Sequence, residues 1–145
     1  MIEITKMSFD DLEKIKNILT EEFDDFWNYN ILKQELEKED TVYIVAKENE
    51  EILGFAGFWI APDDIQITNI VVKKNERKKG IGNLLFDKLI KEAENTDKQE
   101  IFLEVNENNI FAIKLYKRFN FEEIGVRKKY YNGKDSAIIM KKIMR

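Results

Sequence analysis

The sequence predicts a mixed α/β fold in which four helices cover a central sheet of about seven strands. Short stretches in which every second residue is apolar indicate strands. They are interleaved with stretches whose apolar residues recur every three or four positions, as in amphipathic helices. In chain order these stretches give β-α-α-β-β-β-α-β-α-β-β. The length of 145 residues and the hydrophobic content of 43% suit one domain, residues 1–145, burying about 70% of the surface that its unfolded chain exposes.

The chain begins with a strand and two helices. Ile2 and Ile4 alternate with polar residues, which indicates a strand. Ser8 is a typical helix cap, and Asp11 at the third helical position completes a capping box. The helix that follows would bury one apolar face, made of Leu12, Ile15, Ile18 and Leu19. A second helix is expected at about residues 30–37.

Three strands are expected next. Residues 41–47 and 52–60 are separated by a short polar turn, which is a hairpin signal. In the third strand the alternation slips by one residue between Ile67 and Ile70. Such a slip indicates a β-bulge, and a bulge would splay the neighbouring strands and make room for a ligand. The alternative is a regular strand that tolerates two polar residues, Thr68 and Asn69.

The second half of the chain continues the interleaving of helices and strands. A helix opens at two glycines near residue 80 and carries the apolar residues Leu84, Leu85, Leu89 and Ala93. A strand at residues 100–106 and a helix at about 109–118 follow. Two last strands, at about 121–130 and 135–143, flank the turn Asn132-Gly133-Lys134. This order predicts a mixed sheet with helices packed against it.

The composition excludes several kinds of chemistry. The chain contains neither cysteine nor histidine, so it has no disulfide, no thiolate nucleophile and none of the usual zinc ligands, and we expect no metal. Acid–base chemistry must come from carboxylates, tyrosines or lysines. The net charge of −4 argues against nucleic acid as a partner, and no apolar run approaches a membrane span. The first residues do not resemble a signal peptide, so a cytoplasmic protein is expected.

A loop with two glycines is the strongest functional signal. Gly80 and Gly82 open an amphipathic helix, whose first amides form a natural phosphate site that bare glycines allow a ligand to approach. Three cations precede or adjoin them: Arg77, Lys78 and Lys79. No P-loop string occurs, and Leu85 stands where a dinucleotide fingerprint needs a small residue. The remaining interpretations are an R-x-x-G-x-G phosphate loop and a basic loop that precedes a helix by chance.

Two side chains are candidates for acid–base chemistry. Glu104 interrupts an apolar strand, and alternation puts it on the face opposite to Leu103. A carboxylate deep in such a strand suits a general base, and the alternative is a glutamate at a strand end that faces water. Tyr116 follows Asn109 by seven residues, so both project from one face of a helix. Its phenol could protonate a leaving thiolate, or it could anchor the helix among apolar residues.

These blocks together resemble the GCN5-related N-acetyltransferases (GNAT). The loop with Arg77, Gly80 and Gly82 resembles the coenzyme A pyrophosphate loop of that superfamily. A second block resembles the L-E-V-R-x-S-N-x-x-A-x-x-L-Y-x-x-x-G-F segment of the RimI-type ribosomal-protein alanine acetyltransferases: Leu103-Glu104-Val105, Asn109, Ala112, Leu115-Tyr116 and Phe121. The tail of that family is matched by Arg127, Tyr130-Tyr131 and Ala137-Ile138-Ile139-Met140. Its P-W pair has a counterpart in Phe26-Trp27.

The resemblance extends from about residue 2 to residue 142, with departures near the expected acceptor groove. Asn106, Asn108 and Asn120 replace the arginine, serine and glycine of the long segment. Neither the glycine loop nor the pair of Glu104 and Tyr116 is affected. The departures therefore concern the identity of the acceptor.

The resemblance implies a GNAT fold with a bulge and a splay at an acetyl-CoA site. The pantetheine arm would pair with the backbone of Ile70, Val71 and Val72. The pyrophosphate would be bound by amides of Lys78, Lys79, Gly80, Ile81, Gly82 and Asn83. Arg77 would support this loop, and Asn109 would contact the cofactor. Glu104 would act as the base, directly or through water, and Tyr116 as the acid.

The same resemblance implies the acceptor: an N-terminal α-amine, chiefly that of alanine, on a protein such as a small-subunit ribosomal protein. An α-amine has a pKa near 8, against about 10.4 for lysine, so it is the easier nucleophile near neutral pH. The alternatives are a GNAT enzyme acting on a small-molecule amine or a lysine, and a non-catalytic acyl-CoA-binding module. Neither the residues nor the resemblance indicates an oligomeric state.

Overall fold

Seven strands form one sheet, in the order β1-β2-β3-β4-β5-β7-β6, in the computed structural model, which describes residues 1–23, 28–131 and 133–144. The strands are β1 (Glu3–Lys6), β2 (Thr41–Glu48), β3 (Glu51–Ile60), β4 (Ile65–Val72), β5 (Glu100–Asn106), β6 (Glu122–Tyr131) and β7 (Asp135–Ile143). The α-helices in these residues are α1 (Phe9–Ile15), α2 (Tyr29–Glu37), α3 (Ile81–Glu94) and α4 (Ile110–Arg118). A π-helical turn (Leu19–Phe23) and a short 3-10 helix (Lys74–Glu76) complete the chain path. The predicted order of elements and the mixed sheet are confirmed.

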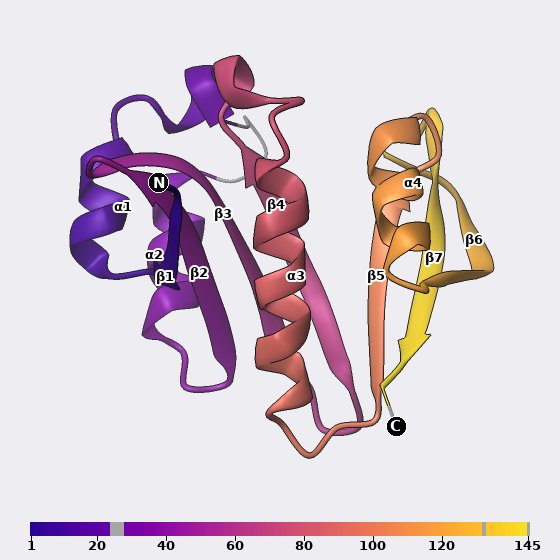
Figure 1. Cartoon of the computed structure of the whole chain (residues 1–145). Coiled ribbons are helices and arrows are strands. Elements are labelled where there is room, and N and C mark those ends of the chain that lie inside the picture. The colour runs from indigo at the N-terminus through magenta and orange to yellow at the C-terminus, as the bar shows by residue number, and fades with distance from the viewer. Residues whose placement is uncertain (24–27, 132, 145) are drawn as a thin grey trace.

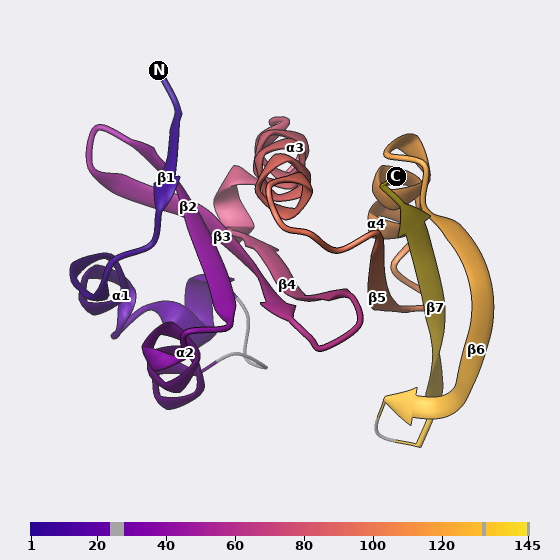
Figure 2. The same ribbon diagram turned by 90° about the horizontal axis from the view of Figure 1, so that it is seen from below.

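The sheet separates two layers of helices (Figure 1). In the view from below, α1 and α2 lie on one face of β2 and β3, and α3 lies on the other (Figure 2). The larger core, which includes Phe58, Phe86 and Phe121, packs α3 and α4 onto the sheet, and a smaller one around Phe23 and Phe55 lies under α1 and α2. Within the described ranges, none of the helices has the length and apolarity needed to cross a membrane.

A bulge interrupts the pairing of β3 with β4. Gly57 pairs with Asn69, but the next residue of β3, Phe58, pairs with Ile67, so Thr68 is an extra residue on β4. The slip of apolar phase in the sequence is therefore a β-bulge, as predicted. Because of this extra residue, the apolar side chains on both sides of the bulge contribute to the same core under α3.

The sheet opens between β4 and β5. These two parallel strands pair only near their first residues, Ile65 with Ile101 and Gln66 with Phe102. Beyond that point β4 stays paired with β3 as far as Val72, while β5 follows β7, and the two strands diverge (Figure 1). The predicted splay is present, and it exposes the second half of β4 along one edge.

The first helix is shorter than its apolar pattern predicts. The predicted capping box is present, with Ser8 and Asp11 each accepting a hydrogen bond from the backbone N–H of the other. The helix ends at Ile15 because the next turn tightens, so that the N–H groups of Lys16 and Ile18 donate to carbonyls three residues back. The residues matched to the family's P-W pair, Phe26-Trp27, lie outside the described ranges.

Candidate functional site

The divergence of β4 and β5 leaves a cleft of about 940 Å³, a volume typical of sites for small molecules and cofactors. Residues from five elements line it, among them Asn69, Ile70, Glu104, Asn109, Tyr116 and Arg127. The two acid–base candidates of the sequence therefore lie in one cleft, although they come from a strand and from a helix.

The N-terminus of α3 lies between the end of β4 and α4. Gly80 caps it with a φ of +83°, a left-handed conformation that glycine adopts without strain. A Cβ added at Gly82 would meet nothing nearer than Leu115 and Val72, both at 3.9 Å, so packing within the protein does not require glycine there. The first amides of a helix have no acceptor within it. These amides, next to an uncrowded Gly82, could bind an anionic group.

The basic loop before α3 is held by its own hydrogen bonds. Arg77 donates from Nε to the carbonyl of Val72 and from Nη2 to the carbonyl of Phe23, each at 3.0 Å. The guanidinium thus links the loop to the end of β4 and to the π-helical turn. Lys79 is paired with Glu76 at 2.9 Å. Arg77 consequently acts on the shape of the loop, and the first backbone amides of α3 remain available to an anion.

On the side of β4 that faces β5, the residues after Gln66 pair with no strand among the residues that the structure describes. They include Ile70, Val71 and Val72, which pair with β3 along their other side. A free strand edge presents N–H and C=O groups in alternation, so an extended molecule with amide groups can add to it as another strand would. The wedge between β4 and β5 therefore suits an elongated, amide-containing ligand.

Glu104 reaches the cleft from the face of β5 that is turned away from α3 and α4. Ile101, Leu103 and Val105 are buried in the core under those helices, and alternation turns Glu104 to the other side. Its side chain is 30% exposed, and its carboxylate lies 2.9 Å from the guanidinium of Arg127 on β6. The expectation of a carboxylate deep in an apolar strand is wrong. Because β4 diverges from β5, this face of the strand borders the open cleft.

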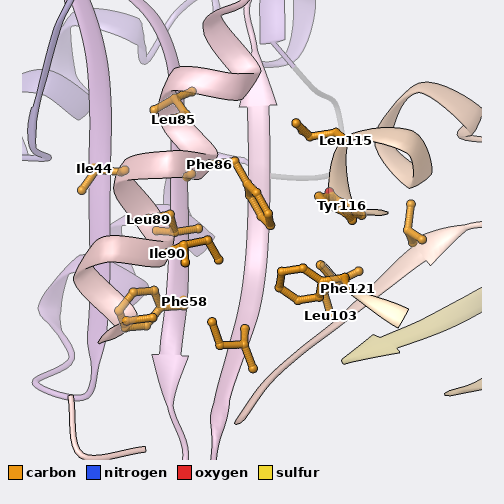
Figure 3. Close-up of a cluster of buried hydrophobic side chains, with 14 of the residues drawn as sticks. Ile44, Phe58, Leu85, Phe86, Leu89, Ile90, Leu103, Leu115, Tyr116 and Phe121 are labelled. Atoms are coloured by element: carbon orange, nitrogen blue, oxygen red, sulfur yellow. The ribbon is translucent and has the colours of Figure 1, made fainter. Parts of the chain in front are cut away.

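Tyr116 reaches the cleft from the opposite face of the sheet. It is buried, and its ring centroid lies 5.1 Å from that of Phe86 and 6.2 Å from that of Phe121 (Figure 3). The ring therefore anchors α4 in the core and also contributes to the wall of the cleft. Glu104 and Tyr116 flank the same space from two faces of the sheet, as a proton acceptor and a proton donor on either side of a reacting group would.

Asn109 is the N-cap of α4. Its Oδ1 accepts a hydrogen bond from the backbone N–H of Ala112 at 3.1 Å. The residue also lines the cleft. Because capping uses the amide oxygen, Nδ2 is the atom through which Asn109 could donate to a ligand.

Sequence reasoning missed Asn69 as a site residue. It lines the cleft and is only 7% exposed, yet its position suggested no more than a polar residue near a bulge. The available signal was the bulge itself. Asn69 is the first residue after the extra Thr68, so its side chain is the first to follow the shifted alternation of the strand. The pairing of Arg127 with Glu104 had no local signal, since β7 lies between their strands.

A splayed sheet with an open strand edge at its cleft, and a glycine-opened helix beside the end of that strand, are the features of an acyltransferase that uses coenzyme A thioesters. The chain belongs to the acetyltransferase (GNAT) family, whose family model matches residues 8–121. A relative from Bacillus subtilis (strain 168), provisionally named a ribosomal protein bS18-alanine N-acetyltransferase, is 32% identical over 139 residues, which are 94% of this chain and 92% of the relative.

Solved structures agree with this family. The crystal structure of the ribosomal-protein-S18-alanine N-acetyltransferase from Escherichia coli has a TM-score of 0.88 at 27% identity, covering 99% of this chain and 94% of that one. Arabidopsis thaliana NAA60 in complex with acetyl-CoA shares the fold, with a TM-score of 0.82 at 20% identity over 99% of both chains. The protein is an N-acetyltransferase with the GNAT fold.

Proposed function

We propose that this enzyme transfers the acetyl group of acetyl-CoA to the N-terminal α-amine of a protein, with the alanine of a small-subunit ribosomal protein as the preferred acceptor, in the cytoplasm. The observation that carries the proposal is the cleft flanked by Glu104 and Tyr116 from opposite faces of the splayed sheet. The names of the relatives from Bacillus subtilis and Escherichia coli support the choice of acceptor.

The cleft fits acetyl-CoA. The open edge of β4 at Ile70, Val71 and Val72 matches the two amides of a pantetheine arm, and the amides from Lys78 to Asn83 match a pyrophosphate. Gly82 supports this fit, because the protein's own packing leaves that position open and a ligand can lie close to its backbone. Arg77 keeps the loop in shape, and Nδ2 of Asn109 is available to donate. When bound, acetyl-CoA supplies the activated acetyl group.

Two side chains move protons in the proposed reaction. Glu104 takes a proton from the acceptor ammonium, directly or through one water, and Arg127 holds the carboxylate in place for this step. The free amine then attacks the acetyl carbonyl and gives a second proton to solvent, so that the new C–N bond forms while the C–S bond breaks. Tyr116 gives its proton to the departing sulfur and is reprotonated by solvent. No residue of the protein is acetylated, in keeping with a chain that has no cysteine.

The energetics of deprotonation favour an α-amine as the acceptor. Its pKa near 8 lies about 2.4 units below that of a lysine side chain, so freeing the amine at pH 7 costs about 3 kcal/mol less. A single carboxylate such as Glu104 is then a sufficient base.

Mass spectrometry of a peptide panel tests the proposal. The panel contains a peptide that starts with Ala-Arg, the same peptide with a blocked N-terminus and an internal lysine, and peptides with other first residues. We expect acetylation of the free N-terminus alone, fastest for alanine. Acetylation of lysine alone would show that the acceptor is a lysine side chain and not an N-terminal α-amine. Transfer to small amines only, or to nothing, would favour a small-molecule enzyme or a binding module.

A further inference from the structure

Asn69 has a buried amide that the protein itself does not satisfy. Apart from tyrosines, only two polar or charged side chains are buried in the described residues, Asp11 and Asn69. Asp11 is bonded to the N–H of Ser8 and paired with Lys47 at 2.7 Å. Neither Oδ1 nor Nδ2 of Asn69 has a hydrogen-bond partner within the described ranges. Because a buried, unpaired amide destabilises a fold, its presence at a cleft points to a ligand.

The neighbours of Asn69 are committed elsewhere. Tyr43, Gly57 and Asn69 lie opposite one another across β2, β3 and β4. The ring of Tyr43 lies over Gly57, where a Cβ would come within 2.4 Å of it. The Tyr43 hydroxyl shares a hydrogen bond with Thr68 at 3.0 Å and donates to Glu35 at 3.2 Å.

The effect of the Asn69 amide on this phenol is weak. Burial raises the pKa of Tyr43 well above its ordinary value, and the Asn69 amide acts in the opposite direction without meeting hydrogen-bond geometry. Since the Tyr43 hydroxyl donates its one proton to Glu35, it cannot serve Oδ1 of Asn69, and this oxygen is left for a molecule in the cleft.

The amide lies on the side of the sheet where the acceptor would enter. On β4, Ile70 and Val72 pack toward α3, whereas Val71 belongs to the core under α1 and α2. Alternation places Asn69 on the face of Val71, away from α3. Glu104 also faces away from α3 and α4. The carboxylate that would deprotonate the acceptor and the unsatisfied amide therefore share one face and one cleft.

We propose that Asn69 binds the first residue of the acceptor and selects for an α-amine, an inference that rests on the function proposed above. Its Oδ1 accepts a hydrogen bond from the acceptor amine, and its Nδ2 donates to the first backbone carbonyl. In an N-terminal residue the amine and this carbonyl are separated by a single Cα atom, so one primary amide spans both. A lysine side chain offers only methylene groups beside its amine and satisfies half of the Asn69 amide.

The test combines a protein variant with an acceptor variant. Asn69→Leu removes both polar atoms at nearly constant shape, and Asn69→Ala serves as a second variant if leucine does not fit. Gln34→Leu is the matched control, because this amide is exposed on α2 and does not line the cleft. The acceptors are an Ala-Arg peptide and its analogue with the first carbonyl reduced to methylene.

We expect Asn69→Leu to raise the KM for the Ala-Arg peptide at least about tenfold, with an unchanged KM for acetyl-CoA and an equal or higher melting temperature. For the unaltered enzyme, the KM for the reduced peptide should exceed that for the Ala-Arg peptide by a comparable factor. For Asn69→Leu the two peptides should have similar KM values, because the substitution and the reduction remove the same contact. Gln34→Leu should stay within about twofold of the unaltered enzyme.

Two results would overturn the assignment of Asn69 while leaving the proposed function intact. One is an unchanged peptide KM in both Asn69→Leu and Asn69→Ala. The other is a rise in KM for the variant with the reduced peptide that equals the product of the rises caused by the substitution and by the reduction alone. If the unaltered enzyme acetylates no N-terminal amine, the proposed function and the role of Asn69 are both overturned, and this outcome is visible before any variant is made.

Discussion

Replacing Glu104 with glutamine removes the proposed base and keeps the shape of the side chain. Glutamine cannot accept a proton near neutral pH, but its amide oxygen can still accept a hydrogen bond from Arg127, which lies 2.9 Å from the carboxylate. The N-terminus of α3 and the edge of β4 are untouched. The substitution should therefore affect the chemical step and leave the binding of acetyl-CoA unchanged.

Two magnitudes separate catalysis from stability in this variant. General-base catalysis contributes roughly 10²- to 10⁴-fold to turnover, which corresponds to about 3–5 kcal/mol in the activation barrier. The ion pair that is lost is partly exposed, at 54% for Arg127 and 30% for Glu104, and such pairs stabilise a fold by about 0–1 kcal/mol. We expect kcat to fall at least roughly 100-fold, while the melting temperature moves by no more than about 4 °C.

The assay follows release of coenzyme A with a thiol reagent, using a peptide that starts with alanine. Glu123→Gln is the matched control, because Glu123 forms a similarly exposed pair with Lys117, at 3.5 Å, and does not line the cleft. An α-amine loses its proton unaided near pH 8, so the defect of Glu104→Gln should shrink as the pH rises to about 9.5.

Turnover within twofold of the unaltered enzyme at pH 7 would refute the assignment of Glu104 as the base. A defect of equal size at both pH values would show that the carboxylate holds the acceptor without deprotonating it. A similar loss in Glu123→Gln would trace the effect to the stability of β6.

Three further predictions address the acid, the cofactor seat and the fold. Tyr116→Phe keeps the ring in the core, so kcat should fall at least roughly tenfold at an unchanged melting temperature; a loss of stability without a loss of turnover would leave Tyr116 a packing role alone. Gly82→Ala adds a methyl group with no protein atom nearer than 3.9 Å and favours the helix by up to about 1 kcal/mol, so the KM for acetyl-CoA should rise while the melting temperature holds or rises. If Gly82→Ala and the unaltered enzyme have equal KM values for acetyl-CoA, Gly82 does not belong to the cofactor site. Burial opposes ionisation of Asp11, but hydrogen bonds from Lys47 and Ser8 outweigh it and lower its pKa. This carboxylate therefore stabilises the fold above about pH 4, and the contribution is lost as the pH falls through the lowered pKa. Urea unfolding against pH should show the acid loss in the unaltered protein and a flatter profile in Asp11→Asn, and parallel profiles would contradict the linkage.

The elements of this fold could be predicted from the sequence because their signals are local. The alternation of apolar residues placed β5 at its observed bounds, Glu100–Asn106. The slip between Ile67 and Ile70 indicated the bulge that the pairing of β3 with β4 contains. The path after Ile15 could not be predicted, because apolar residues continue at helical spacing there while the backbone hydrogen bonds change to a tighter turn.

The sequence by itself therefore determined the order of elements, the bulge, the glycine-opened helix and the family, since each depends on residues that are neighbours along the chain. Only the tertiary structure decided how the site residues meet. Glu104 is accessible because β4 diverges from β5 after two residue pairs, and Arg127 reaches it across an intervening strand. The amide oxygen of Asn69 is unsatisfied because Tyr43, 26 positions earlier, donates its hydroxyl proton to Glu35. These relations depend on which strands lie side by side and where they diverge. That arrangement joins residues far apart along the chain, so no local pattern of side chains encodes it.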